Sequence, residues 1–586
     1  MFLKGVITIY DALLLYAKRY AKKAFEEGLF EAARVCENIS SRAPETFREA
    51  LQLLWFIQLV YCSYIAGNPS LSFGRLDLFL EKFYDRDIKK GNLTKDEASL
   101  LILDYYCKNN LIMGRGEHQI SAENDKKNTG WARNLCYDSP QYLNIGGRRA
   151  DGTLLDGELT QLFVENIVPS FKNPVIVVRY SSKMQYTCPK LWKTVVDKMR
   201  QSSSMIVYNE DMVISGFEYM GIPKIEAETF EHYGCNHPTL PAIERILAYK
   251  GIIPAVLFNE ALKEWTLKGF EPETTEQLYD AVICAVKQAA AEKLNELLIK
   301  AQQHLNIPTN YLEFADCFSR YSVVNATTHK NKGSKYFSST FIFANFSSFV
   351  DIFTAVDTLV IKQKKLTLSR LIEATNNNFE GYPLEYALCK SVGKFGSDDP
   401  VSNKYANELM LRLTDTVKLL ADKLLPSNEE TPRMVIRFST ESDNEHIIIG
   451  KKLGATPDGR LIGMPLSQNS SPSVGSSING LTARLAAVAS LPFERFTAGA
   501  QNLSIQKSAF KGCEGLEKLA SILGGYFDMG GLQLQLTSID TDLLRDAQKN
   551  PDTHRDLMVR ITGYSALFND LTKEAQDEII NREEMK

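Results

Sequence analysis

An α/β fold built around one large catalytic unit is predicted for this chain of 586 residues, and two sequence patterns support the prediction. Amphipathic stretches with helical spacing recur along the chain, and short runs of consecutive apolar residues lie between them. Such runs suit strands that are covered on both faces. Hydrophobic residues make up 44% of the chain, which is enough to bury a substantial core.

The first 66 residues are predicted to be helical, because apolar positions recur at steps of three and four residues through segment 17–39. The apolar stretch 51–66 is predicted to be a buried core helix, opened by a capping box at 46–49. It carries Gln52 and Gln58 and is short for a membrane span, so no membrane segment is expected. Further helices are predicted over 95–107, 158–167, 190–201, 275–304, 366–376 and 401–425.

Strands are predicted at 174–181, 204–208 and 434–438, where the chain reads as continuous apolar runs. Helices that alternate with buried strands favour an α/β barrel or a layered sheet. A stretch rich in Gly, Ser, Pro and Asn follows at 454–480 and is predicted to be a loop. We therefore expect a large domain over 1–455 and a C-terminal domain over 456–586.

Charge and cysteine usage argue against several classes of protein. The net charge is −4 with both signs interspersed, so no nucleic-acid partner is expected. Lys4 and Asp11 interrupt the apolar N-terminal stretch, and no signal peptide is predicted. The ten cysteines form no CxxC or other close pair, so no metal site is expected in the chain, and a reducing cytoplasm fits best.

The first candidate functional segment surrounds Gly563. A strand-like run precedes it and a helix is predicted over 571–582, which places Gly563 at the tip of a loop. A lone glycine is most often a turn residue. Glycine is nevertheless suited to hold a radical, because loss of an α-hydrogen leaves a planar centre that a β-carbon would crowd.

The second such segment is Tyr-Gly-Cys-Asn-His-Pro at 233–238, which follows an acidic, helix-like stretch. A single cysteine is most often an inert small hydrophobe in a core. A thiol such as Cys235 can also exchange a hydrogen atom with carbon, because S–H and activated C–H bonds are close in strength. An imidazole can take or give a proton, so His237 could carry a proton, or it could simply form a hydrogen bond in the loop.

Both segments resemble signatures of the glycyl radical enzymes. The run around Gly563 is similar to the radical loop of that family, and the Cys235 loop is similar to the loop that carries its reactive cysteine. Further similar motifs follow in the family's order, at 72–77, 144–147, 209–211, 378–381, 398–399 and 454–460. For each of these motifs alone a structural role is favoured, since Gly and Asp are common in turns.

The resemblance implies a ten-stranded α/β barrel surrounded by helices, in a homodimer. It implies a radical stored on Gly563 and passed to Cys235, which attacks a small organic substrate. A separate radical S-adenosylmethionine activating enzyme with a 4Fe-4S cluster would remove the glycine hydrogen, so this chain needs no bound cofactor of its own. Dehydration, a lyase reaction, is the leading expectation, and formate C-acetyltransferase-like or decarboxylating C–C cleavage is the alternative.

The sequence departs from the family pattern in three places. Dehydratases of the family carry a glutamate where this chain has His237, and pyruvate formate-lyase proper has two adjacent cysteines where this chain has Gly234 and Cys235. Family members also carry a long, mainly helical region upstream of the segment that Met1 opens here. These departures leave open a function of another class, that of a non-catalytic relic or interaction subunit.

Overall fold

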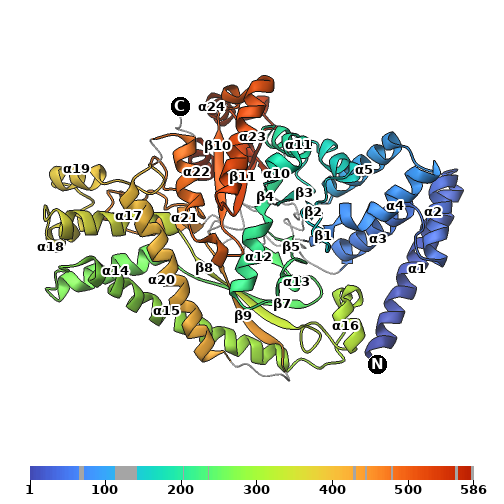
Figure 1. The fold of residues 1–586 in the computed structure, drawn as a ribbon, viewed down its shortest axis with the longest axis horizontal. Coiled ribbons are helices and arrows are strands. Elements are labelled where there is room, and N and C mark those ends of the chain that lie inside the picture. Colours follow the sequence, from blue (N-terminus) through green and yellow to red (C-terminus); the bar gives the residue numbers. More distant parts are fainter. Residues whose placement is uncertain are drawn as a thin grey trace.

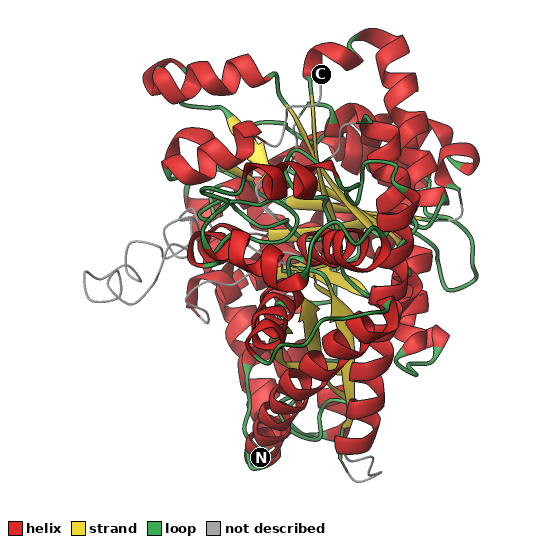
Figure 2. Cartoon of the chain, turned by 90° about the vertical axis from the view of Figure 1, so that its left-hand side faces the viewer, coloured by secondary structure: helices red, strands yellow, loops and turns green. Residues whose placement is uncertain are grey.

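The computed structural model describes residues 1–64, 71–112, 141–181, 183–201, 204–234, 237–425, 431–441, 445–476, 479–560 and 565–581. Strands run through the middle of the molecule and helices surround them (Figure 2). The α/β class predicted from the sequence is confirmed. Among the described residues, no helix combines the length and the hydropathy that crossing a bilayer requires.

Five helices gather at one end of the molecule, drawn in blue in Figure 1. They are α1 (Phe2–Glu26), α2 (Phe30–Ser41), α3 (Phe47–Tyr64), α4 (Leu76–Lys90) and α5 (Lys95–Asn110). The predicted capping box opens α3, since the Glu49 N–H donates to Thr46 Oγ1 at 3.2 Å and the Thr46 N–H donates to Glu49 Oε2 at 3.3 Å. The prediction that this helix is a core helix is only partly right, because most of its described side chains are half-buried.

A six-stranded sheet forms the centre of the fold. Its order is β1 (Leu71–Arg75), β2 (Gln141–Gly146), β3 (Val175–Tyr180), β4 (Met205–Asn209), β11 (Gln533–Ser538) and β10 (Ala500–Ile505). Strands β1 to β4 run parallel, β11 runs antiparallel to β4, and β10 runs parallel to β11. The strands predicted at 174–181 and 204–208 are β3 and β4, and two strands from the C-terminal part complete the sheet.

Helices cover one face of this sheet. They include α9 (Glu158–Glu165), α10 (Met184–Thr187), α11 (Pro189–Met199) and α23 (Gly512–Asp528). Trp192 on α11 is fully buried, and its indole N–H donates to the carbonyl oxygen of Ala520 on α23 at 2.9 Å. Tyr180 of β3 stacks on Phe527 of α23 with ring centroids 4.9 Å apart. The strands are thus enclosed on this side, as their continuous apolar sequences predict.

A second sheet has three parallel strands, β7 (Glu244–Ile252), β8 (Tyr336–Phe343) and β9 (Arg433–Ser439). The strand predicted at 434–438 is β9. Around this sheet lie α14 (Pro254–Leu267), α15 (Thr275–Leu305), α17 (Phe346–Val356), α18 (Leu368–Asn376), α19 (Pro383–Ser391) and α20 (Pro400–Leu424). One isolated parallel bridge joins Ser439 to Ala498, just before β10, so the two sheets meet there.

The acidic stretch before Cys235 is not the continuous helix that its sequence resembles. After α12 (Glu210–Tyr219), only the single turn α13 (Lys224–Ala227) is helical, and the chain then enters β5 (Glu231–Tyr233). The guanidinium of Arg179 accounts for the change, because it captures the carbonyl oxygens of Glu228 at 3.0 Å and Phe230 at 2.8 Å. The chain therefore leaves the helix at that point.

The C-terminal part packs partly on a core of its own. It contains α22 (Leu481–Ala489), η3 (Phe493–Arg495), α24 (Thr541–Lys549), β12 (Met558–Arg560), β13 (Ser565–Leu567) and α25 (Lys573–Asn581). A hydrophobic cluster separate from the main core includes Leu544, Val559, Ala566, Phe568 and Ile579. The loop predicted at 454–480 is irregular in its described residues, but long stretches of it are buried.

Replacement of Gly216 on α12 tests how this helix docks against the C-terminal part. A β-carbon there would lie 2.1 Å from the carbonyl oxygen of Phe496, beside η3. We expect Gly216→Ala to lower the free energy of unfolding by about 1–3 kcal/mol in urea titrations, because backbone would have to move. The matched variant Gly525→Ala on α23 meets open space and should be neutral or gain up to about 1 kcal/mol. Equal urea midpoints for both variants would contradict this packing.

Candidate active site

A β-hairpin carries the position of Cys235. Strand β5 pairs antiparallel with β6 (His237–Thr239), and Tyr233 lies opposite His237. Gly234 opens the connection with φ at +67°, a left-handed conformation that glycine adopts without strain. Cys235 itself lies outside the described residues, so the structure locates the hairpin but not the thiol.

Side chains from two strands of the central sheet bind this hairpin. We call the face of the sheet on which the hairpin lies the inner face. From β3, Arg179 pairs with Glu210 at 2.8 Å and donates to the carbonyl oxygens that precede β5. From β2, Asn144 accepts the His232 N–H at 2.9 Å and donates to the His232 carbonyl at 3.2 Å. The backbone of β5 is therefore fixed at several points.

Gly147 of the motif at 144–147 has a structural role. Its φ is +79°, and a β-carbon there would lie 2.0 Å from the Glu210 carboxylate. Any side chain would displace the carboxylate that neutralises Arg179. The motif thus leaves room for the ion pair between Arg179 and Glu210, which holds the hairpin.

A second hairpin carries the position of Gly563. Strand β12 pairs antiparallel with β13, Arg560 lies opposite Ser565, and the four connecting residues, Gly563 among them, lie outside the described residues. Arg560 is 4% exposed. It donates to Gln535 on β11 at 3.3 Å, to Ser204 before β4 at 3.1 Å, and to Ser565 at 3.1 Å. The base of this hairpin is therefore tied to the central sheet.

The two hairpins approach each other over the inner face. The ring of His232 on β5 lies 4.8 Å from the ring of Tyr208 on β4, and Tyr208 pairs with Gln533 on β11. Two residues further along β11, Gln535 holds Arg560. The charge of Arg560 is close enough to contribute to lowering the pKa of His232, after burial and His237. The loops in which Cys235 and Gly563 were predicted thus belong to neighbouring hairpins.

His237 is described, and it faces a carboxylate. Its Nε2 lies 3.2 Å from Glu441 Oε2, and both side chains are almost fully buried. The imidazole also contacts the ring of Tyr249 on β7, with ring centroids 4.1 Å apart and a tilt of 35° between the rings. The sequence did not indicate Glu441 as a functional residue. Glu441 lies two residues after the end of β9, belongs to no motif and is far from His237 in the chain.

This pair can move a proton. An imidazole beside a carboxylate is held in one orientation, and the carboxylate stabilises the positive charge that the ring gains on accepting a proton. Arg437 of β9 fixes the strand that carries His237, since it donates to the Pro238 carbonyl and to Thr340 Oγ1 at 3.0 Å. The strand that carries His237 is therefore fixed, and the ring is held beside Glu441.

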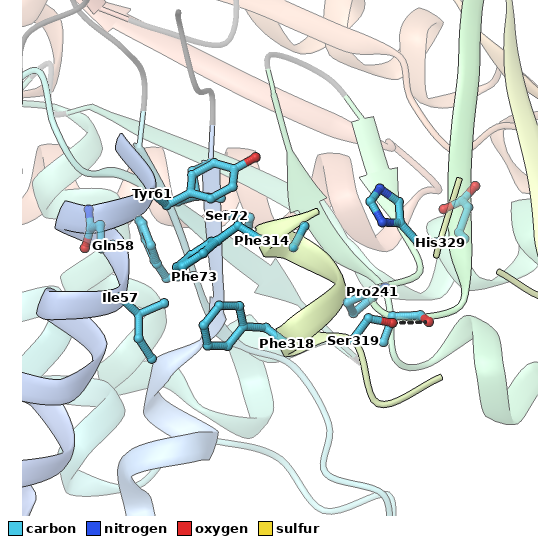
Figure 3. Close-up of a pocket in the computed structure, with 14 residues that line it drawn as sticks. Ile57, Gln58, Tyr61, Ser72, Phe73, Pro241, Phe314, Phe318, Ser319 and His329 are labelled. Atoms are coloured by element: carbon cyan, nitrogen blue, oxygen red, sulfur yellow. Dashed lines mark hydrogen bonds between the residues drawn. The ribbon is translucent and has the colours of Figure 1, made fainter. Parts of the chain in front are cut away.

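A separate cavity of about 350 Å³ lies beside the hairpin, and Figure 3 shows its walls. The rings of Tyr61, Phe73, Phe314 and Phe318 line it, and the last two belong to η1 (Phe314–Phe318). None of its described lining residues belongs to β5, β6, β12 or β13. In the part of the chain that the structure describes, no group of three His, Cys, Asp or Glu residues could hold a metal ion.

Comparison with known proteins identifies two family models in the chain. Pyruvate formate lyase-like matches residues 1–432, and glycine radical matches residues 466–569. Trans-4-hydroxy-L-proline dehydratase of Clostridioides difficile is 27% identical, with 98% of this chain and 73% of that protein covered. Isethionate sulfite-lyase of Nitratidesulfovibrio vulgaris is 25% identical, with 99% and 71% covered.

Among solved structures, the glycerol-bound form of the B12-independent glycerol dehydratase from Clostridium butyricum is similar to this chain. The TM-score is 0.84 at 26% identity, and the match covers 99% of this chain and 74% of that one. The chain therefore spans roughly three quarters of the length of these relatives.

The pH dependence of stability tests the burial of His232. Burial, together with the charges of His237 and Arg560, lowers the pKa of His232 to about 3, against 6.5 for an ordinary histidine. The unfolded chain binds a proton below pH 6.5 and the folded chain does not, so stability is lost as pH falls, by up to about 1.4 kcal/mol per pH unit.

We expect His232→Phe to lack this loss. Its free energy of unfolding in urea, relative to that of the unchanged protein, should rise between pH 7 and pH 5. Parallel pH profiles for the two proteins would mean that His232 titrates normally in the folded state.

Proposed function

Because the chain belongs to the pyruvate formate lyase-like family of glycyl radical enzymes, we propose that Gly563 stores an unpaired electron and that Cys235 takes hydrogen from a small organic substrate. The approach of the two hairpins over the inner face is the observation that supports this most directly. Radical transfer requires the α-carbon of one loop to come near the sulfur of the other. The hairpins that carry these residues are neighbours.

After one activation step, the proposed cycle returns every hydrogen atom that it moves. A radical S-adenosylmethionine activating enzyme first removes one hydrogen atom from the Gly563 α-carbon. The glycyl radical then takes the hydrogen atom of the Cys235 thiol, and the thiyl radical takes a hydrogen atom from a substrate carbon. After the substrate bond has broken, the product radical recovers a hydrogen atom from the thiol. The thiyl radical formed in that step takes a hydrogen atom from the Gly563 α-carbon, which restores the glycyl radical.

Loss of water is the proposed bond-breaking step. His237 accepts the proton of the hydroxyl on the radical carbon, while Glu441 stabilises the charged ring. The neighbouring C–O bond breaks, and the leaving hydroxide takes the proton from His237 to form water. Relatives named as dehydratases of hydroxyproline and of glycerol support this assignment. His237 thereby takes the place of the family's glutamate.

We extend the proposal to the architecture and the assembly. The six-stranded and three-stranded sheets are proposed to be parts of the family's ten-stranded barrel, which the bridge between Ser439 and Ala498 supports. We also propose two domains, over 1–455 and 456–586, and the family matches over 1–432 and 466–569 support this division. A cytoplasmic homodimer in anaerobic metabolism is the proposed form of the enzyme.

Spectroscopy after activation tests the proposal. Anaerobic incubation with a matching activating enzyme and S-adenosylmethionine should give a glycyl-type doublet in electron paramagnetic resonance. Gly563→Ala should abolish the doublet, whereas Cys235→Ala should keep it and lose turnover. Air should then cut the unchanged protein at Gly563 and release roughly 23 residues (586 − 563). A folded protein without a doublet would be the non-catalytic relic, and release of formate or carbon dioxide would indicate C–C cleavage.

Substitution of the His237 and Glu441 pair tests the proton transfer. We expect His237→Phe to lower kcat by roughly 10²- to 10⁴-fold with an unchanged yield of radical, because only the proton step is removed. The double variant His237→Glu with Glu441→Gln should recover part of that loss, since it supplies one carboxylate without a second beside it. If the His237→Phe variant converts substrate at the normal rate, the role of His237 is only to form a hydrogen bond in the loop.

A further inference from the structure

An apolar stripe is exposed along the first half of helix α1. Its members are Leu3, Ile7, Tyr10 and Leu14, each between 39% and 58% exposed. Steps of four, three and four residues place them on one face of the helix, in the narrow pattern of a seam between two paired helices. Another side of the same half packs on the molecule itself, where Val6 is buried with Cys317. The seam is therefore left facing solvent.

The same seam packs on another helix further along α1. Its next two positions, Ala17 and Ala21, are buried in a cluster with Cys36 and Ile39 of α2. Figure 1 shows α2 beside one half of α1, while the half that carries the end marked N extends past it. Since the second half of the seam already binds one helix, the exposed first half is suited to bind another.

Two charges flank the exposed seam on one side. Lys4 directly follows Leu3, and Asp11 directly follows Tyr10, so both lie on the same flank. Neither charge has an ion-pair partner among the residues that the structure describes. They stand seven residues apart, about 10 Å along the helix axis, so they cannot pair with each other within α1. A helix that presents the two charges in the opposite order would neutralise both.

We propose that α1 of a second copy of this chain covers the exposed seam, with the two helices antiparallel across a two-fold axis. In this arrangement Leu3 meets Leu14 of the second copy, and Ile7 meets its Tyr10, so apolar residues face apolar residues throughout. The inference assigns a surface to the homodimer proposed above, and it depends on no step of the radical chemistry.

The charges select the antiparallel orientation. Lys4 meets Asp11 of the second copy, and by symmetry Asp11 meets its Lys4, so two ion pairs form across the interface. A parallel pair would instead place Asp11 beside Val6 of the second copy, which is 3% exposed and carries no charge. That orientation would leave Asp11 without a partner.

Analytical ultracentrifugation of the full chain tests the interface without activation. Because the seam is short and small interfaces are weak, we expect a reversible monomer–dimer equilibrium at roughly 1–100 µM protein. Ile7→Asp should weaken association by at least about 10-fold, since it would bury a charge in the seam. Ile7 is 58% exposed in the single chain, so this variant should fold normally.

Leu267→Asp is the matched control, because Leu267 is an exposed apolar residue at the end of α14 and lies outside the seam. It should leave the association unchanged. A protein that stays monomeric over the whole concentration range would overturn the inference, and so would equal association of the Ile7→Asp variant and the unchanged protein.

Charge reversal tests the antiparallel pairing. Lys4→Asp and Asp11→Lys each place like charges opposite one another, so each should weaken association by roughly 3- to 30-fold at low salt. The double variant Lys4→Asp with Asp11→Lys should restore it, because both ion pairs re-form with their signs exchanged. A double variant that stays weak would overturn the antiparallel pairing, and single variants without effect would mean that another segment covers the seam.

The same experiments separate this inference from the proposed function. A monomer that gives the glycyl doublet after activation would overturn the α1 interface alone. A dimer that responds to charge reversal as expected but gives no doublet would overturn the radical function alone.

Discussion

The buried ion pair between Arg179 and Glu210 is the interaction on which the candidate site depends. Both side chains are 1% exposed, and Arg179 also binds the two carbonyls that lead into the Cys235 hairpin. A buried pair adds little net stability, but loss of one partner costs about 3–5 kcal/mol because the other charge is left uncompensated. Its contribution is to specify one position for the hairpin over the sheet.

The two faces of the central sheet carry different kinds of side chain. The face covered by helices is packed with apolar and aromatic side chains such as Trp192. The inner face presents polar groups such as Asn144 and Gln535, which bind the backbone of one hairpin and the guanidinium of the other. These polar residues form hydrogen bonds with the inserted hairpins, so the sheet can be buried and still carry polar side chains on this face.

The sequence predicts the secondary structure correctly where its apolar residues follow one clear pattern, either a continuous run or a helical spacing. Strands β3, β4 and β9 are continuous apolar runs, and helices such as α15 keep their spacing over many turns. Strands β2 and β10 were missed because inward polar residues interrupt their apolar pattern. The motifs located both hairpins, but Glu441 and the clamp by Arg179 arise from contacts between distant segments, which one sequence does not reveal. The stretch before Cys235 was misread because those tertiary contacts override its helical character.

The separate hydrophobic cluster beneath β12 and β13 has a consequence for opening of the molecule. Its side chains pack on one another and not within the main core, so we expect the C-terminal segment to unfold locally at a smaller free energy than the main core. Arg560 ties that unit to the central sheet through neutral groups, Gln535 and Ser204. We therefore expect β12 and β13 to separate from the central sheet while that sheet stays folded.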